Sequence, residues 1–308
     1  MKKYFYFLLF AIHFVAIAQH NPDYTIFNYN LNLANPAFAG KNGKTQLATN
    51  FKKMWAGVEN SLNTSIISFT TPFGNGVGLG LNVVRDDFYL FNETIASVDL
   101  SYSVKLNQHN DLLFGIEAQG AFFNADLSRI NTQTVNDPLF TRTNNNFNPN
   151  FSIGVALKNE KYFAHIAILD VLKHNRFSRN SDLETEDNYF KINTGGGFSM
   201  DLNDKLSLNT MALVRITQSA PLSFDVTSML DINKKFDIGL TYRWKNAVMA
   251  NLFFNATSWA QLGYSYGLSV NELSRYNGGS YEFFIRIHFD KQTKESKKRV
   301  QKRAPYIN

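Results

Sequence analysis

The chain has 308 residues, no cysteine and a formal net charge of +6. The missing cysteines exclude disulfides, thiolate nucleophiles and cysteine-ligated metals. Two lysines lie in the first three residues, and residues 291–308 hold seven basic residues and one acidic residue, so 22 basic and 24 acidic residues remain between positions 19 and 290. A nearly neutral body lacks the basic folded face that nucleic-acid binding requires, which excludes that class of function.

The first eighteen residues have the pattern of a secretory signal peptide. An apolar run from Tyr4 to Ala18 follows a positively charged start and ends on small residues at an A-x-A spacing. The alternative is a membrane-anchoring helix, which needs a longer apolar run than this one. We therefore predict export of the chain, with residues 1–18 removed and a mature protein that begins at Gln19.

Residues 19–43 read as an extended lead-in segment before the first strand. Pro22 and Pro36 fix the backbone angle φ and disfavour helix just before them, while Gly40 and Gly43 permit a sharp turn. We predict that this segment bears on the periplasmic mouth of the folded body; the alternative is a periplasmic tail that merely reaches it. Trp55 and Gly57, in the first predicted hairpin, are candidate supports for a folded arrangement at that mouth.

From residue 44 to residue 290 the chain repeats an alternation of apolar and polar residues. In residues 96–106 every second residue is apolar, and period two puts the two sets on opposite faces of a strand. The runs are about ten residues long, which exceeds the ordinary strand length and suits a tilted strand that crosses the hydrocarbon layer. We predict fourteen strands, at 44–53, 61–71, 76–86, 94–106, 111–124, 150–158, 161–170, 190–202, 205–216, 221–232, 235–243, 246–254, 258–269 and 279–290.

The connections between these predicted strands sort by length. Those after even-numbered strands are short and rich in turn-forming residues, whereas the three longest, 125–149, 171–189 and 270–278, follow odd-numbered strands. Bacterial outer-membrane barrels have short periplasmic turns and longer outer loops. The sequence therefore predicts an all-β fold, a transmembrane antiparallel barrel of about 14 strands over residues 44–290, rather than a soluble sandwich. In its outer loops Asn145, Arg176 and Arg179 are candidate contacts to partner proteins.

The last predicted strand and the tail after it give a further indication. The apolar row of this strand ends on Phe289, and an aromatic-ended closing strand resembles the signal that assembly machinery reads on outer-membrane barrels. The basic tail, residues 291–308, is expected in the periplasm. Its candidate contacts to an acidic partner or to anionic headgroups are Lys297, Lys298 and Arg299. The alternative is a disordered, solvated tail, because blocks of like charge repel.

The sequence lacks the motifs of catalysis. The histidines show no ligand spacing, and there is neither a nucleophile elbow nor a phosphate-binding loop. Asp86 and Asp87 lie next to an outer turn, where solvated carboxylates are more common than a calcium site. We therefore predict a protein that is not an enzyme and that holds neither a cofactor nor a metal.

Residues 21–90 carry a more specific pattern. Asn35-Pro36-Ala37 is followed by Gly40 just before the first strand, and a Trp-x-Gly segment comes after that strand. The positions that carry the pattern are Pro22, Tyr24, Asn35, Pro36, Ala37, Gly40, Trp55, Gly57, Pro72, Gly78, Gly80 and Asp86. This opening resembles the PorP/SprF family of type IX secretion outer-membrane proteins. Asn60-Ser61-Leu62 departs from the Gly-Ala-Pro of many members, which bears on the details of the first hairpin.

The resemblance implies a function through protein contacts. Members are accessory components of type IX secretion and gliding motility, which support export or surface anchoring of cargo adhesins and contact periplasmic partners of the machinery. One alternative is a passive pore, because charged residues fall on the predicted lumen face; a soluble exported β-protein is another. The lumen-facing charges are Lys105, Glu117, Lys191, Arg215, Asp225, Arg243, Glu282 and Arg286.

Overall fold

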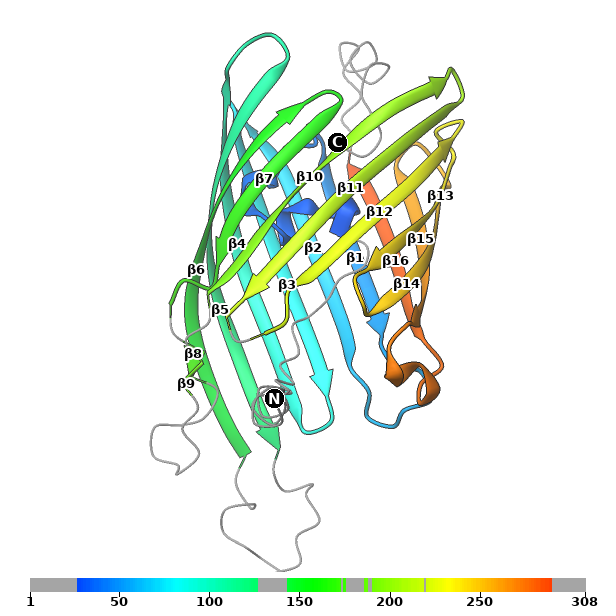
Figure 1. Ribbon diagram of the computed structural model, residues 1–308. Coiled ribbons are helices and arrows are strands. Elements are labelled where there is room, and N and C mark those ends of the chain that lie inside the picture. The colour runs from blue at the N-terminus through cyan, green and yellow to red at the C-terminus, as the bar shows by residue number, and fades with distance from the viewer. Residues whose placement is uncertain are drawn as a thin grey trace, which may run out of the picture.

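The computed structural model describes residues 27–126, 143–172, 174–175, 186–187, 190–218 and 220–289, and within these ranges fourteen antiparallel strands close into a barrel (Figure 1). The barrel strands are β1 (Thr45–Lys53), β2 (Asn63–Gly74), β3 (Val77–Phe88), β4 (Phe91–Lys105), β5 (Asn110–Asp126), β6 (Thr143–Asn159), β7 (Tyr162–Leu169), β10 (Lys191–Asn203), β11 (Leu206–Thr217), β12 (Ser223–Ile232), β13 (Phe236–Arg243), β14 (Ala247–Asn255), β15 (Ala260–Ser269) and β16 (Ser280–Phe289). β1 pairs with β16, which closes the ring. The predicted fourteen-stranded barrel is confirmed. Two further strands, β8 (His174–Asn175) and β9 (Glu186–Asp187), form a separate ribbon.

Side chains along the wall alternate between the lumen and the outer face. In β5, Leu113 and Phe123 point inward and are buried, whereas Phe114 and Ile116 point outward and are 42% and 57% exposed. Exposed apolar rows are unfavourable in water and favourable against lipid. Because hydrocarbon offers no hydrogen bonds, the closed ladder also satisfies the backbone groups that an open sheet would leave unpaired.

The helices of the described residues are short 3-10 turns. None of them is long and apolar enough to span a membrane.

The two ends of the barrel differ in the length of their connections. The three longest connections, 127–142, 170–190 and 270–279, all join strand ends at one end of the barrel, and connections of two to four residues join the strand ends at the other (Figure 1). We assign the end with the long connections to the cell exterior and the other to the periplasm. Thr45 and Phe289 pair at the periplasmic end, so β1 begins there and β16 ends there.

Two predicted placements toward the outer end of the barrel were wrong. β6 begins at Thr143 rather than at residue 150, and Asn145 lies within this strand opposite Asn124, not in an outer loop. The run of asparagines gives no apolar alternation by which a strand is recognised. Trp55 and Gly57 lie at the outer end, in the connection between β1 and β2, and not at the periplasmic mouth. An antiparallel strand that starts in the periplasm must deliver its following turn to the opposite side.

Several predicted positions lie outside the described residues. They include the signal peptide, the basic tail and the candidate positions Pro22, Tyr24, Arg176, Arg179, Lys297, Lys298 and Arg299.

Candidate functional site

The barrel lumen is occupied by residues 27–43, which we call the plug. The plug forms three short 3-10 turns, η1 (Phe27–Tyr29), η2 (Leu31–Leu33) and η3 (Pro36–Phe38), inside the wall (dark blue in Figure 1). We predicted an extended segment at the mouth; the chain instead folds into turns within the lumen. Asn35 starts η3 because its Oδ1 accepts a hydrogen bond from Ala37 N at 2.9 Å, and Pro36 follows at the first helical position, where its missing N–H costs nothing.

The plug rests on a row of small residues that crosses five strands, which we call the seat. The strand register places these residues side by side on the lumen face: Gly78, Ser101, Gly115, Gly154 and Ala167. A Cβ atom on Gly115 would lie 2.1 Å from Ala37 N, and one on Gly154 would lie 1.9 Å from Asn35 Oδ1. At Gly115 and Gly154 the seat therefore admits the plug only because glycine stands there, against the plug backbone at the first position and against the Asn35 side chain at the second.

Hydrogen bonds from the wall hold the plug at this level. Asn35 Nδ2 donates to the carbonyl oxygens of Val155 and Ile166 at 3.2 and 3.0 Å. Asn193 Nδ2 donates to Ala34 O at 3.0 Å, and Ser101 Oγ donates to Ala39 O at 2.6 Å. The plug backbone is thus paired with the wall, as buried polar backbone groups require.

The plug leaves the lumen at its periplasmic end through a tight turn. Gly40 has a φ of +65°, and a Cβ there would lie 2.3 Å from Thr71 O, so both the backbone angle and the space require glycine. Lys41 Nζ then donates to Gly76 O at 2.6 Å in the turn between β2 and β3. Partial burial lowers the pKa of Lys41 to about 8.

An aromatic contact joins the plug to the opposite wall. The ring of Tyr29 stacks on Phe253 with ring centroids 3.6 Å apart, and its hydroxyl donates to Asp237 Oδ2 at 3.3 Å. The guanidinium of Arg286 lies 5.4 Å from the centre of the same ring and also donates to Tyr29 O. Wall strands on both sides of the lumen therefore contact the plug.

Polar networks fill much of the remaining space. Asn32 Nδ2, in the plug, donates to Asn82 Oδ1 at 2.8 Å, and Asn82 Nδ2 donates to the buried carboxylate of Asp99 at 2.8 Å. Farther round the wall, Asp225 accepts from Arg215 Nη2 at 2.8 Å and from Arg243 Nε at 2.9 Å. Some of the lumen-facing charges are thereby paired with one another. The hollow beside the plug, near Glu117 and Lys191, has a volume of only about 130 Å³.

The structure brings together one part of the motif recognised in the sequence. Asn35, Pro36, Ala37 and Gly40 of the plug lie against the row that contains Gly78, and a Cβ on Gly80 would be 3.2 Å from Ala39 Cβ. Pro72 pairs with Gly78 on the neighbouring strand.

Asp86 stands apart from this contact. It lies toward the outer end of β3, where it accepts a hydrogen bond from Thr64 Oγ1. Trp55 and Gly57 lie beyond the end of β1, in the first outer connection.

Sequence reasoning missed Ser101, Gly115, Gly154 and Ala167, which complete the seat. Their one signal is that each is a small residue on the lumen-facing set of its strand. Among the described residues, no group of three or more acidic or histidine side chains is placed to hold a metal ion.

Solved structures with a similar fold are outer-membrane barrels. A FadL homologue from Pseudomonas aeruginosa matches with a TM-score of 0.50 and 13% identity over 88% of this chain and 95% of that one. The toluene transporter TbuX from Ralstonia pickettii matches with a TM-score of 0.50 and 10% identity over 85% and 94%. At these identities the likeness shows the fold alone. No curated protein matches the sequence.

The family assignment rests on the sequence. The sequence model of the family described as type IX secretion system membrane protein PorP/SprF matches residues 16–287. This range includes the plug, the seat and nearly all of the barrel. The matched range contains the motif residues that lie on the seat. The chain belongs to the PorP/SprF family of type IX secretion membrane proteins, and its barrel places it in the outer membrane.

Proposed function

We propose that this chain is a closed outer-membrane scaffold of type IX secretion and gliding motility, which acts by protein contacts at its two ends and not as an open channel. It supports export or surface anchoring of cargo adhesins, contacts periplasmic parts of the machinery, and catalyses no reaction. The observation that carries this proposal is the fit between the plug and the seat. A lumen filled by the protein's own chain leaves the two rims as the surfaces on which function depends.

The two rims suit different partners. The outer end carries the three longest connections and the extended ends of β4, β5 and β6. Long connections on a rigid scaffold are the usual place for recognition. The periplasmic end carries only short turns, among them residues 106–109, together with the exit of the plug. We expect exported cargo at the outer end and machinery proteins at the periplasmic end.

Position-specific cross-linking in living cells tests this proposal. A photo-activated residue at Asn145, on β6 at the outer end, should capture an exported type IX substrate. The same residue at His109, in a periplasmic turn, should capture a periplasmic component and no exported substrate. If both positions cross-link only lipid or general porins while export continues, the scaffold proposal is wrong.

A passive transport barrel is the second candidate. It is favoured by the charged residues on the lumen face, and barrels of similar fold are described as a toluene transporter and a monoaromatic hydrocarbon channel. The two proposals differ in whether the plug stays on its seat. A deletion of the gene that reduces uptake of a small solute, with export of adhesins unchanged, would favour transport.

A further inference from the structure

The outer face of β3 to β6 changes from apolar to polar residues along one row of paired positions. On β5 the outward residues from Leu112 to Phe122 are apolar or glycine, and Asn124 and Asp126 follow. Ten residues of strand tilted by about 40° rise about 26 Å, close to the height of the apolar band of such barrels. Phe122 therefore marks the outer edge of the hydrocarbon layer on this wall.

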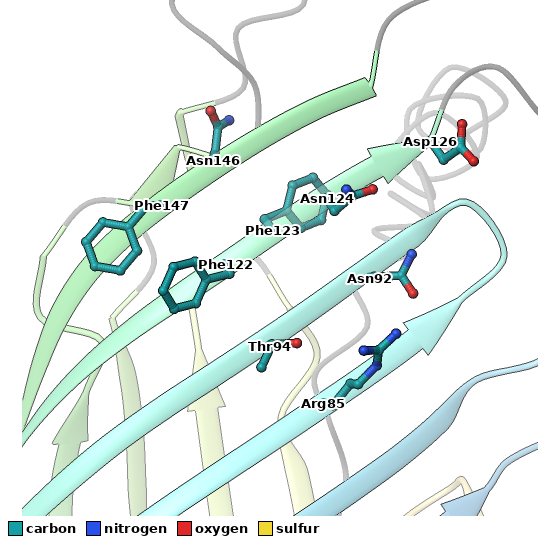
Figure 2. A pocket seen from close by; sticks show the side chains of 9 residues that line it. All are labelled: Arg85, Asn92, Thr94, Phe122, Phe123, Asn124, Asp126, Asn146 and Phe147. Atoms are coloured by element: carbon teal, nitrogen blue, oxygen red, sulfur yellow. The ribbon is translucent and has the colours of Figure 1, made fainter.

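The residues at this edge form a row in register across four strands. Arg85 pairs with Thr94, Thr94 with Phe122, and Phe122 with Phe147. A hollow of about 530 Å³ opens along this row (Figure 2). Its size lies within the range of small-molecule sites. The hollow therefore stands where acyl chains end and lipid headgroups begin.

Two phenylalanine rings form the apolar side of the hollow. Phe122 and Phe147 lie on adjacent strands with ring centroids 4.9 Å apart, and they are 55% and 58% exposed. A Cβ on Gly120 would come within 2.7 Å of the Phe147 ring, so glycine there leaves room for the ring to lie across β5. Figure 2 shows the two rings side by side.

Hydrogen-bonding groups form the opposite side. Asn92, Asn124 and Asp126 line the hollow beyond the rings, on the side away from the apolar band. Arg85 also lines it, but Asp87 already accepts from Arg85 Nε at 3.1 Å and from Nη2 at 3.0 Å. Among the described lining residues, one arginine, already paired with Asp87, is balanced by Asp126, so these residues offer amide and carboxyl groups without an excess of positive charge, which suits hydroxyl groups better than phosphate.

We propose that this hollow binds the sugar headgroup of a glycolipid of the outer leaflet. Its acyl chains continue down the apolar face of β4 to β6, which already contacts lipid. One sugar ring packs against Phe122 and Phe147, and its hydroxyl groups exchange hydrogen bonds with Asn92 and Asp126. The charge balance and the continuity with the lipid-facing surface favour this occupant over an anionic phospholipid or a peptide.

The test uses the full chain in mild detergent and purified rough lipopolysaccharide from which the phosphate groups have been removed, with binding followed by native mass spectrometry. We expect Phe147→Ala to lower the affinity about tenfold, as loss of a stacked aromatic surface does. Gly120→Ala, which displaces the Phe147 ring without removing it, should lower the affinity as well. Tyr242→Ala is the matched control, because Tyr242 is an exposed aromatic residue at the outer end of β13. It should leave binding unchanged.

Further binding measurements distinguish the glycolipid from other possible ligands. Core oligosaccharide without its lipid should bind more weakly than the whole glycolipid, and phosphatidylglycerol should fail to compete. Binding should also persist in 0.5 M salt, because it does not depend on net charge. Equal losses in Phe147→Ala and Tyr242→Ala would overturn the proposal in favour of general lipid contact. Full competition by phosphatidylglycerol, or equal binding of the lipid-free saccharide, would overturn it too.

Discussion

Replacing Gly115 by alanine should loosen the plug and leave the barrel closed. The new Cβ would lie 2.1 Å from Ala37 N and 2.3 Å from Pro36 C, and both neighbours are backbone atoms that cannot rotate away. The plug must therefore move by roughly 1 Å, which strains its hydrogen bonds to the wall. Overpacking of this kind costs about 1–3 kcal/mol, and one weakened hydrogen bond adds about 1 kcal/mol.

Hydrogen exchange of the plug amides measures this effect directly. A loss of about 2–3 kcal/mol in the free energy of local opening corresponds to roughly 30- to 150-fold faster exchange over residues 30–41. Gly267→Ala is the matched control, because its Cβ would meet Met249 Cγ, the flexible part of a side chain, at 2.7 Å. It should leave exchange in the plug unchanged. If the plug amides of Gly115→Ala exchange at the wild-type rate, the role assigned to the seat is refuted.

Three further changes test other contacts of the lumen. Asp225→Asn should lower the free energy of unfolding by about 3 kcal/mol, because buried Arg243 loses its carboxylate; a change below 1 kcal/mol in urea titrations would contradict this. Tyr29→Ala should cost about 3 kcal/mol of plug stability and accelerate proteolysis of the plug, and unchanged proteolysis would count against the aromatic contact. The pKa of Lys41 is lowered to about 8 in the folded protein, so the unfolded chain binds the extra proton above that pH; stability should rise between about pH 8 and 10.5, and Lys41→Met should abolish the rise.

The strands were predictable because their pattern is local. Alternation over about ten residues, with a turn at each end, specifies both the strand and its lipid-facing side, and a barrel follows from closing the set. The start of β6 was missed because asparagines on both faces remove the alternation. The charges at Asp225, Arg243 and Glu282 were correctly placed on the lumen face, since their position follows from period two alone.

The plug was not predictable from the same reasoning. Its motif, Asn35 to Gly40, was recognised as a family feature, but its physical role depends on partners far along the chain. Gly115 and Gly154 become neighbours of the plug only through the register of β5 and β6, and register is a property of paired strands. A single sequence shows that these residues are small and face inward, but it does not show that they stand at the same level.

Single-channel recording of the purified full chain in planar bilayers tests the central claim most directly. We predict that the wild-type protein shows no conductance steps above the bilayer background, because the plug stays on its seat. A variant that lacks residues 27–40 and still inserts as a barrel should conduct. Steps of equal size from the wild type and from this variant would contradict a lumen closed by the protein's own chain.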